Sequence, residues 1–381
     1  MMILLGLAAL AGSPPPPVVL LPPAPPIVTV DGEMPATIVS FRPGTARCEG
    51  GEEALQFAEL PLPVVAAGSD ADPPAPVRIE FRIDSDGRPL GIREVPRASR
   101  GGFYYNSADV LPAFAASRFR AGSERSGCVI AYDVRPASVE QADPATLYRM
   151  VALQIPSGSP GLGRAIFDRT KPPGSNCFDD GSVNVRLRAY PAFETIPQAP
   201  GTVSYSFLAF DLDSSGRPRN ARVLGSAGNA ELDRQSLAAV RASRFSPLAR
   251  QGCTYTYWRR PAEPLRAPEP PALESFRPER SNCPKETIPW AYVPPLNFPS
   301  EFQRRGIEGW AILSYDVAPW GGTGNVRVVA AEPAAAFGEQ ARRIVSGARE
   351  PASDSGHVGC LTRVVFRMPQ GRAGPALNAP D

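Results

Sequence analysis

The run at residues 210–223, FDLDSSGRPRNARV, contains the residue types of a calcium-binding loop. Asp211, Asp213 and Ser215 stand at alternate positions, and a glycine follows where such a loop must turn sharply. The last position of a calcium loop needs a bidentate carboxylate, but here it is occupied by Arg222. The run therefore predicts a hairpin turn between two strands, and we expect no metal there.

A related run, FRIDSDGRPLGIRE, occupies residues 81–94, and its glycine has a different offset from its first aspartate. It fails the calcium pattern sooner, and it has the same alternation of apolar residues before an Asp-Ser-Gly turn. Two similar hairpins in one chain indicate an internal repeat.

The cysteines mark this repeat most clearly. In chain order they are Cys48, Cys128, Cys177, Cys253, Cys283 and Cys360. Taken as consecutive pairs they have nearly equal separations, and the second member of each pair follows a glycine. Six cysteines allow many connectivities, but a triplicated unit favours Cys48–Cys128, Cys177–Cys253 and Cys283–Cys360.

We interpret these cysteines as structural disulfides rather than metal ligands or redox thiols. The chain has no CxxC motif and one histidine, His357, so a zinc site would need cysteines from two units. Disulfides indicate an oxidising compartment. The apolar residues 1–11 end in Ala-Leu-Ala and predict a signal peptide, since a membrane span needs about twenty residues.

Composition excludes several classes of function. Lys and Arg total 40, Asp and Glu total 38, and the net charge is +2, so there is no electrostatic basis for binding nucleic acid. The single histidine disfavours Ser-His and Cys-His catalysis, and acidic pairs such as Asp179-Asp180 and Glu52-Glu53 are typical of solvated surface charge. We expect a protein that is not an enzyme and has no cofactor.

Each unit predicts a strand, a hairpin turn, a second strand, an amphipathic helix and a third strand. The turns contain Gly87, Gly216 and Gly321, and the clearest helix follows Asn229, a plausible N-cap. The residues expected to face the core from the first strands are Val77, Ile79, Phe81 and Ile83; Leu208, Phe210 and Leu212; and Leu313, Tyr315 and Val317.

This pattern predicts an α+β fold of three tandem small domains, each an antiparallel sheet with one or two helices on one face. The expected segments are a signal peptide (1–11), a Pro-rich linker (12–34), repeat one (35–137), a linker (138–164), repeat two (165–262), a linker (263–274), repeat three (275–369) and a tail (370–381). The first inter-repeat linker includes DPATLYRMVALQ, which predicts a helix serving as linker or brace.

Repeat three contains FPSEFQRRGIEGWAILSYDV and repeat two contains ELDRQSLAAVRASRFSP. Both stretches resemble the C-terminal domain of the TonB family, with repeat one a weaker match. The resemblance implies a short helix before the Gly-Ile-Glu-Gly motif, capped by Ser300 with Gln303 reaching back. It also implies a periplasmic protein of the Gram-negative envelope, linked to transmembrane transport.

Domains of that family pair an edge strand with an extended peptide of an outer-membrane transporter. In this chain the resemblance implies docking at the last strand of repeat three, Cys360 to Met368, with Arg363, Val365 and Arg367 toward the partner. Two alternatives remain: an energy transducer whose membrane anchor is missing from this sequence, and a structural spacer. The sequence leaves the partner and the oligomeric state open.

Overall fold

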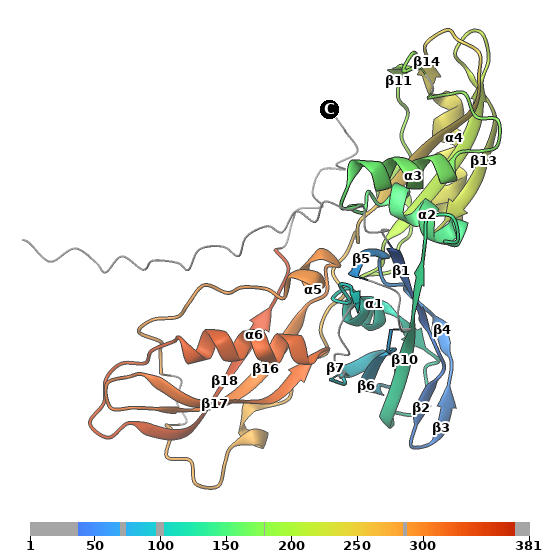
Figure 1. Cartoon of the computed structure of the whole chain (residues 1–381). Coiled ribbons are helices and arrows are strands. Elements are labelled where there is room, and N and C mark those ends of the chain that lie inside the picture. Colours follow the sequence, from blue (N-terminus) through green and yellow to red (C-terminus); the bar gives the residue numbers. More distant parts are fainter. Residues whose placement is uncertain (1–36, 69–73, 97–102, 179, 285–287, 370–381) are drawn as a thin grey trace, which may run out of the picture. The chain divides into compact units, whose positions relative to one another are not determined.

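The three repeats share one succession of elements: strand, turn, strand, helix, strand (Figure 1). The computed structural model describes residues 37–68, 74–96, 103–178, 180–284 and 288–369. The shared elements are β6 (Val77–Ile83), β7 (Pro89–Glu94), α1 (Val110–Ala116) and β10 (Arg125–Ala137) in repeat one; β12 (Ser204–Leu212), β13 (Pro218–Ser226), α4 (Ala230–Ala242) and β15 (Arg250–Arg259) in repeat two; and β16 (Gly309–Val317), β17 (Thr323–Glu332), α6 (Ala335–Ser346) and β18 (His357–Phe366) in repeat three. The pairing is antiparallel, in the orders β7-β6-β10, β13-β12-β15 and β17-β16-β18. The predicted α+β class with small antiparallel sheets is confirmed.

The first of the shared strands in each repeat (β6, β12 and β16) lies between two other strands and buries all the side chains predicted to face the core. In β6 the intervening residues are exposed or half-buried, as alternation predicts. In β12 and β16 nearly every residue is buried, because the second face of the sheet is also covered. Over β12 the cover includes Tyr148, whose ring stacks 5.0 Å from that of Phe207.

Each hairpin turn depends on its glycine. Gly87, Gly216 and Gly321 have φ values of 77°, 74° and 85°, a conformation that other residues adopt at a cost. A Cβ at these positions would lie 2.2, 2.3 and 2.0 Å from the carbonyl oxygens of Phe119, Phe245 and Glu350, respectively. The three turn glycines approach a backbone carbonyl in the same way, so the repeats share backbone geometry as well as sequence pattern.

The stretch that resembles a calcium loop is a hairpin turn, as predicted. Asp213 accepts hydrogen bonds from the backbone N–H groups of Ser215 (2.9 Å) and Arg217 (3.0 Å), which closes the turn between β12 and β13. Asp211 accepts from the N–H of Gly252 at 2.9 Å and so ties β12 to the start of β15. Both carboxylates therefore serve backbone donors.

Helix starts give one correct and one wrong prediction. Asn229 caps α4, since its side chain accepts from the N–H of Leu232 at 3.1 Å. The expected cap at Ser300 is wrong: α5 (Ser300–Arg304) already includes this residue, Pro299 holds the N-cap position, and no side chain caps the helix. The Ser300 hydroxyl instead contacts the carboxylate of Glu301 at 3.4 Å.

Each repeat is bridged by a disulfide to its last strand, from Cys48 at the end of β2 (Ala46–Cys48) in repeat one and from the segment before the sheet in repeats two and three. The bonds join Cys48 to Cys128, Cys177 to Cys253 and Cys283 to Cys360, across 80, 76 and 77 residues. This is the connectivity that the triplicated pattern favours.

The asparagine before the first cysteine of repeats two and three fastens the bridge. Asn176 donates its N–H to the carbonyl of Gln251 and accepts the N–H of that residue on its side chain, at 3.1 and 2.8 Å. Asn282 makes the same reciprocal pair with Val358, at 3.2 and 2.6 Å. The asparagine of the Ser-Asn-Cys motif thus hydrogen-bonds the backbone at the start of the last strand.

Repeat one carries additional strands that the sequence reading missed. They are β1 (Thr37–Pro43), β2 (Ala46–Cys48), β3 (Gly51–Glu53), β5 (Val64–Gly68) and β8 (Phe103–Tyr104), which extend the sheet as β3-β2-β10-β1-β5-β8. The strand β1 lies antiparallel along β10, on the side away from β6. The last strand of repeat one therefore has no open edge beside β1.

The segment predicted as the linker 138–164 is folded. It contains α2 (Pro144–Ala152), the helix expected there, and the start of α3 (Pro160–Thr170). Leu147 and Ile166 pack in a buried cluster with Ile38 of β1. Shorter elements are β4 (Leu55–Phe57) with β9 (Arg118–Phe119), β11 (Val185–Leu187) with β14 (Arg244–Phe245), η1 (Phe193–Thr195) and η2 (Leu273–Phe276).

Repeats one and three share a core. One buried cluster includes side chains of both, and Ile92 of β7 donates its N–H to the carbonyl of Pro333 at 2.9 Å. Glu332 accepts from Arg82 at 2.9 Å and from the N–H of Gly91 at 2.7 Å. A chain of independent modules would lack these contacts.

The predicted signal peptide (1–11), Pro-rich linker (12–34) and tail (370–381) lie outside the described residues. Within the described ranges, none of the helices combines the length and apolar character that crossing a membrane requires.

Candidate partner-binding groove

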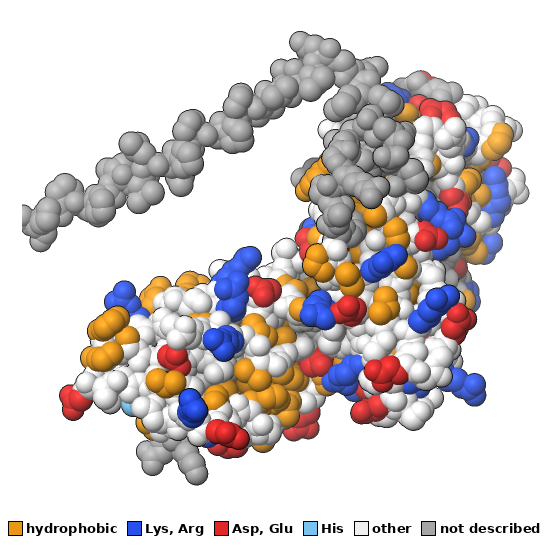
Figure 2. All heavy atoms as spheres, turned by 60° about the horizontal axis from the view of Figure 1, so that its bottom comes forward, with side chains coloured by type: hydrophobic (Ala, Val, Ile, Leu, Met, Phe, Trp, Pro, Cys, Tyr) orange, Lys and Arg blue, Asp and Glu red, His pale blue; other side chains and the backbone are white. Residues whose placement is uncertain are grey.

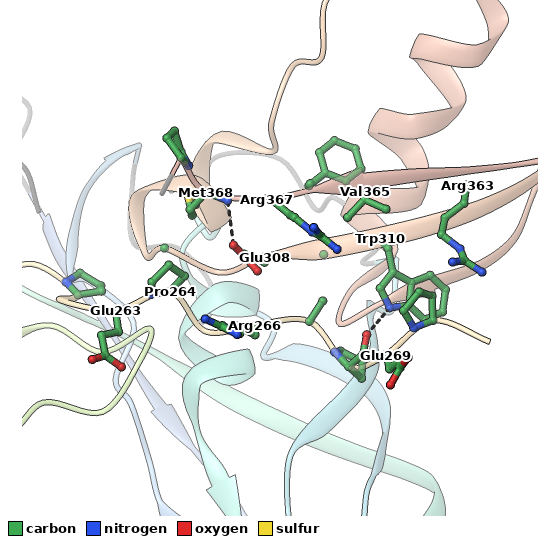
Figure 3. A pocket seen from close by; sticks show the side chains of 18 of the residues that line it. Glu263, Pro264, Arg266, Glu269, Glu308, Trp310, Arg363, Val365, Arg367 and Met368 are labelled. Atoms are coloured by element: carbon green, nitrogen blue, oxygen red, sulfur yellow. Dashed lines mark hydrogen bonds between the residues drawn. The ribbon is translucent and has the colours of Figure 1, made fainter. Parts of the chain in front are cut away.

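The three residues predicted to meet a partner line one groove of about 1420 Å³ (Figure 3). Arg363, Val365 and Arg367 alternate along the C-terminal half of β18 and the residue after it, so their side chains project from one face. Phe366 points to the other face, where its ring lies 5.3 Å from that of Phe337 on α6. The groove therefore lies on the sheet face opposite the helix.

The facing wall is the proline-rich segment 261–270, part of which was predicted as a linker. Leu265 forms a parallel β-bridge with Ile307, next to the start of β16. The indole N–H of Trp310, a buried residue on the groove face of β16, donates to the carbonyl of Pro268 at 2.7 Å. These contacts hold the segment across the sheet and keep the groove open along β18.

The backbone of β18 shows which groups are available to a partner. Met368 donates its N–H to the carboxylate of Glu308, on the β16 side, at 2.9 Å. Because backbone groups alternate along a strand, Arg363, Val365 and Arg367 point theirs away from β16. Within the described residues no hydrogen bond connects these outward groups to another segment.

Strand pairing distinguishes the repeats at this edge. In repeat one, β1 covers the outer side of β10. In the described part of the chain, β15 pairs only with β12 and β18 pairs only with β16. Repeats two and three thus keep a last strand with one partner, and in repeat three the groove runs along that strand.

The groove carries charges of both signs, as does the face of the molecule seen in Figure 2. The guanidinium of Arg363 donates to the carbonyl of Pro271 at 2.5 Å, and Glu308 is engaged by Met368. Arg367 is exposed and makes no side-chain hydrogen bond or ion pair with a described residue. The charge of Arg367 is therefore available to a bound segment.

In the ranges that the structure describes, no group of three or more His, Cys, Asp or Glu side chains is placed to hold a metal ion. The features that converge here are a strand edge, apolar surface and a free guanidinium, which suit recognition of an extended chain.

Sequence reasoning missed Arg305, which anchors the start of repeat three's sheet to repeat one. It is the C-cap residue of α5, just before the Gly306–Gly309 stretch that lines the groove, and its side chain is 2% exposed. Its guanidinium binds Asp109 through two hydrogen bonds of 2.7 and 2.6 Å and Glu59 through one of 2.8 Å. Both acids belong to repeat one, so Arg305 joins the two repeats.

The acidic partners shift the pKa of the Arg305 guanidinium. Burial by itself lowers the pKa of Arg305, but the ion pairs with Asp109 and Glu59 outweigh burial and raise it above its ordinary value. A buried and fully paired guanidinium holds the two repeats in a fixed arrangement, because removing the arginine or its acids leaves an uncompensated buried charge. Asp109 and Glu59 lie 196 and 246 residues away in the chain, so no local pattern predicts the contact.

Comparison with known families supports the recognition of repeats two and three. Residues 189–261 and 294–368 match the model of a family described as Gram-negative bacterial TonB protein C-terminal. These two segments are TonB C-terminal domains. The second domain includes α5, β18 and the sheet side of the groove, whereas the facing wall at 261–270 lies almost entirely between the two matched segments.

TonB C-terminal domains are protein-interaction modules of the Gram-negative envelope that bind outer-membrane proteins, and they are not enzymes. Repeat one lies outside both matched segments and is related to the TonB domains by its element order, turn and disulfide. No curated protein matches the chain.

Proposed function

We propose that this chain is a periplasmic binding protein that docks on an extended segment of an envelope protein, such as an outer-membrane transporter, by β-strand addition to β18. The observation that carries the proposal is the outer edge of the C-terminal half of β18, which pairs with no other described strand and lies beside a groove of about 1420 Å³. Small-molecule pockets commonly measure roughly 300–1,000 Å³. The size and elongated lining suit a peptide.

Three disulfides support an oxidising compartment such as the periplasm. The TonB C-terminal domains in repeats two and three support an envelope partner. Arg363, Val365 and Arg367 would contact the added strand through outward backbone groups, and their side chains would line the groove beside it. The role proposed is binding, linked to transport across the outer membrane.

The test uses the full, oxidised chain and peptides that correspond to N-terminal segments of outer-membrane transporters. Surface plasmon resonance should detect binding by the wild type. Val365→Pro should weaken it at least tenfold, because proline removes an outward N–H and leaves the bonds to β16 in place. The control Val365→Thr retains the N–H and should bind like the wild type. Absence of binding by folded, oxidised protein would overturn the proposal.

A structural spacer is the second candidate, and the Arg305 junction favours it. A guanidinium buried between two repeats fixes their spacing without any need for a ligand. Capture from envelope extract by immobilised protein separates the two functions. A docking protein retains a partner that Val365→Pro loses, whereas a spacer retains nothing that depends on this edge.

A further inference from the structure

The proline-rich segment that crosses the sheet of repeat three is bound to it at regular intervals. Residues 261–271, called the strap below, read PAEPLRAPEPP. Three strap carbonyls accept hydrogen bonds from the sheet: Leu265 from the backbone N–H of Glu308 (2.9 Å), Pro268 from the indole N–H of Trp310 (2.7 Å), and Pro271 from the guanidinium of Arg363 (2.5 Å) (Figure 3). Successive acceptors are therefore three residues apart.

This interval is the period of a polyproline II helix, which has three residues per turn and no hydrogen bonds within itself. Exposure follows the same period. Glu263, Arg266 and Glu269 are exposed, whereas Leu265 and Pro268 are half-buried. After the β-bridge at Leu265 the strap is neither helix nor strand. One side of the strap thus faces the sheet at each turn of a polyproline II helix.

The sheet face opposite α6 has the features of a polyproline II site. Grooves that bind such segments are lined by aromatic residues, and Trp310 supplies a buried aromatic ring together with a donor to a strap carbonyl. Leu265 is the one anchor that is not proline: it donates its N–H to the carbonyl of Gly306 at 2.8 Å and packs against the core. The site therefore selects an apolar residue followed by prolines at the third and sixth positions.

The equivalent face of repeat two has a different cover. Tyr205 corresponds to Trp310, since they lie equally far before Phe210 and Tyr315, the residues paired with the second cysteines. Tyr205 packs against side chains of the helix α2. The domain fold therefore accepts unrelated segments on this face, and the strap is a ligand of the face and not a part of the sheet.

We propose that the sheet face opposite α6 in repeat three is a binding site for a proline-rich segment of a separate envelope protein, and that the strap occupies this site in cis until such a segment displaces it. The hydrogen bonds from the sheet reach strap carbonyls only, so another chain with the same pattern satisfies the same donors. The groove leaves one flank of the strap open to an incoming segment. The TonB C-terminal domain supports an envelope protein as its source.

This site is the face of the sheet, so it stands whether or not a partner docks at the edge of β18. The strap is tethered beside the site, and its high effective concentration should make binding of a second proline-rich segment weak in the wild type. Weakening the strap should therefore strengthen binding of such a segment.

The test weakens the strap and leaves the site unchanged. The triple variant Pro268→Gly, Pro270→Gly and Pro271→Gly keeps every strap carbonyl, but it removes the restriction on φ that favours the bound conformation. A fluorescent peptide with the sequence of residues 261–272 is added to the full, oxidised chain, and its anisotropy is measured. The triple variant should bind the peptide at least tenfold more tightly than the wild type. If that variant does not fold, Pro270→Gly alone should give a gain of about two- to fivefold.

The indole donor identifies the place of binding. Trp310→Phe in the triple variant keeps an aromatic ring, removes the N–H and should weaken binding about fivefold. The matched control is Trp320→Phe, on the turn between β16 and β17 and 76% exposed, which should bind like its parent.

Three results would contradict the proposal. Equal binding by the wild type and a folded strap variant would mean that the strap does not occupy the site. Binding that Trp310→Phe leaves unchanged would place the peptide elsewhere. Dimers of the triple variant that form with rising concentration would assign the face to the strap of a second copy and not to a separate protein.

Discussion

Tyr315 donates a hydrogen bond of 2.7 Å to the buried carboxylate of Glu350, at the place where the other two repeats pair phenylalanines. In repeat one the rings of Phe81 and Phe119 stack at 5.4 Å, and in repeat two the equivalent rings lie 5.3 Å apart. In repeat three both phenylalanines of this pair are replaced, one by Tyr315 and the other by Glu350. The equivalence holds in the backbone too, since the N–H of Glu350 and of Phe119 donates to the glycine of its hairpin turn.

We expect Tyr315→Phe to lower the free energy of unfolding by about 1–3 kcal/mol, because it leaves a buried carboxyl without its donor. Combining it with Glu350→Phe should recover most of the loss, since the pair then reproduces that of the other repeats. Urea denaturation of the two single variants and the double variant measures the coupling. Additive losses would show that the two positions act independently.

Alkaline pH should destabilise the protein in part through Tyr315. Burial, followed by the hydrogen bond to Glu350, raises the pKa of this phenol above its ordinary value near 10. The unfolded chain then loses the proton at lower pH than the folded chain, so the free energy of unfolding falls as pH rises above about 10. The fall should be shallower in Tyr315→Phe, and an unchanged slope would contradict the assignment. Tyr132 and Tyr257 contribute to the remaining slope, because burial raises their pKa values as well.

Arg305→Met should lower the free energy of unfolding by about 3–5 kcal/mol, because the largely buried Asp109 loses its ion-pair partner and Glu59 keeps only the longer pair with Arg149, at 3.7 Å. The matched control is Arg304→Met, next in the chain and 67% exposed, which should change stability by about 0.5 kcal/mol or less. Chemical denaturation of the two variants gives the comparison. Equal, small effects would mean that the junction does not hold the repeats together.

Replacing Cys283 and Cys360 with alanine should lower stability by up to about 4.5 kcal/mol, the chain-entropy value for a loop of this length. The equivalent replacement of Cys177 and Cys253 should have a similar effect, because the loop lengths are nearly the same. Non-reducing peptide mapping of the wild type establishes the pairing first. Bonds that join one repeat to another would contradict the fold itself.

Local signals predicted the repeats well. The turn glycines and the alternation in β6 depend on residues close in sequence, and the spacing of the cysteines is a repeat that can be counted along the chain; the structure shows the elements and bonds they predict. The sequence contains no local pattern that predicts the contacts between repeats. Arg305 and Glu59, or β1 and β10, come together through the packing of distant segments, which no periodicity encodes.

The groove was predicted only in part. The sequence indicated the strand and the three residues on it, because these follow from alternation along β18. It gave no sign of the facing wall, since the segment 261–270 has the composition of a linker. The prediction of Ser300 as a helix cap was wrong because Pro299 holds the N-cap position, so α5 begins one residue earlier than expected.

Hydrogen exchange at single amides of β18 tests strand addition most directly. In the free, oxidised protein the amides of Val365 and Arg367 should exchange quickly, because they point outward, while those of Val364 and Phe366 should be protected by pairing with β16. Adding a transporter segment should slow exchange at Val365 and Arg367 and leave Val364 and Phe366 unchanged. Binding that leaves the outward amides as fast as before would contradict docking at this edge.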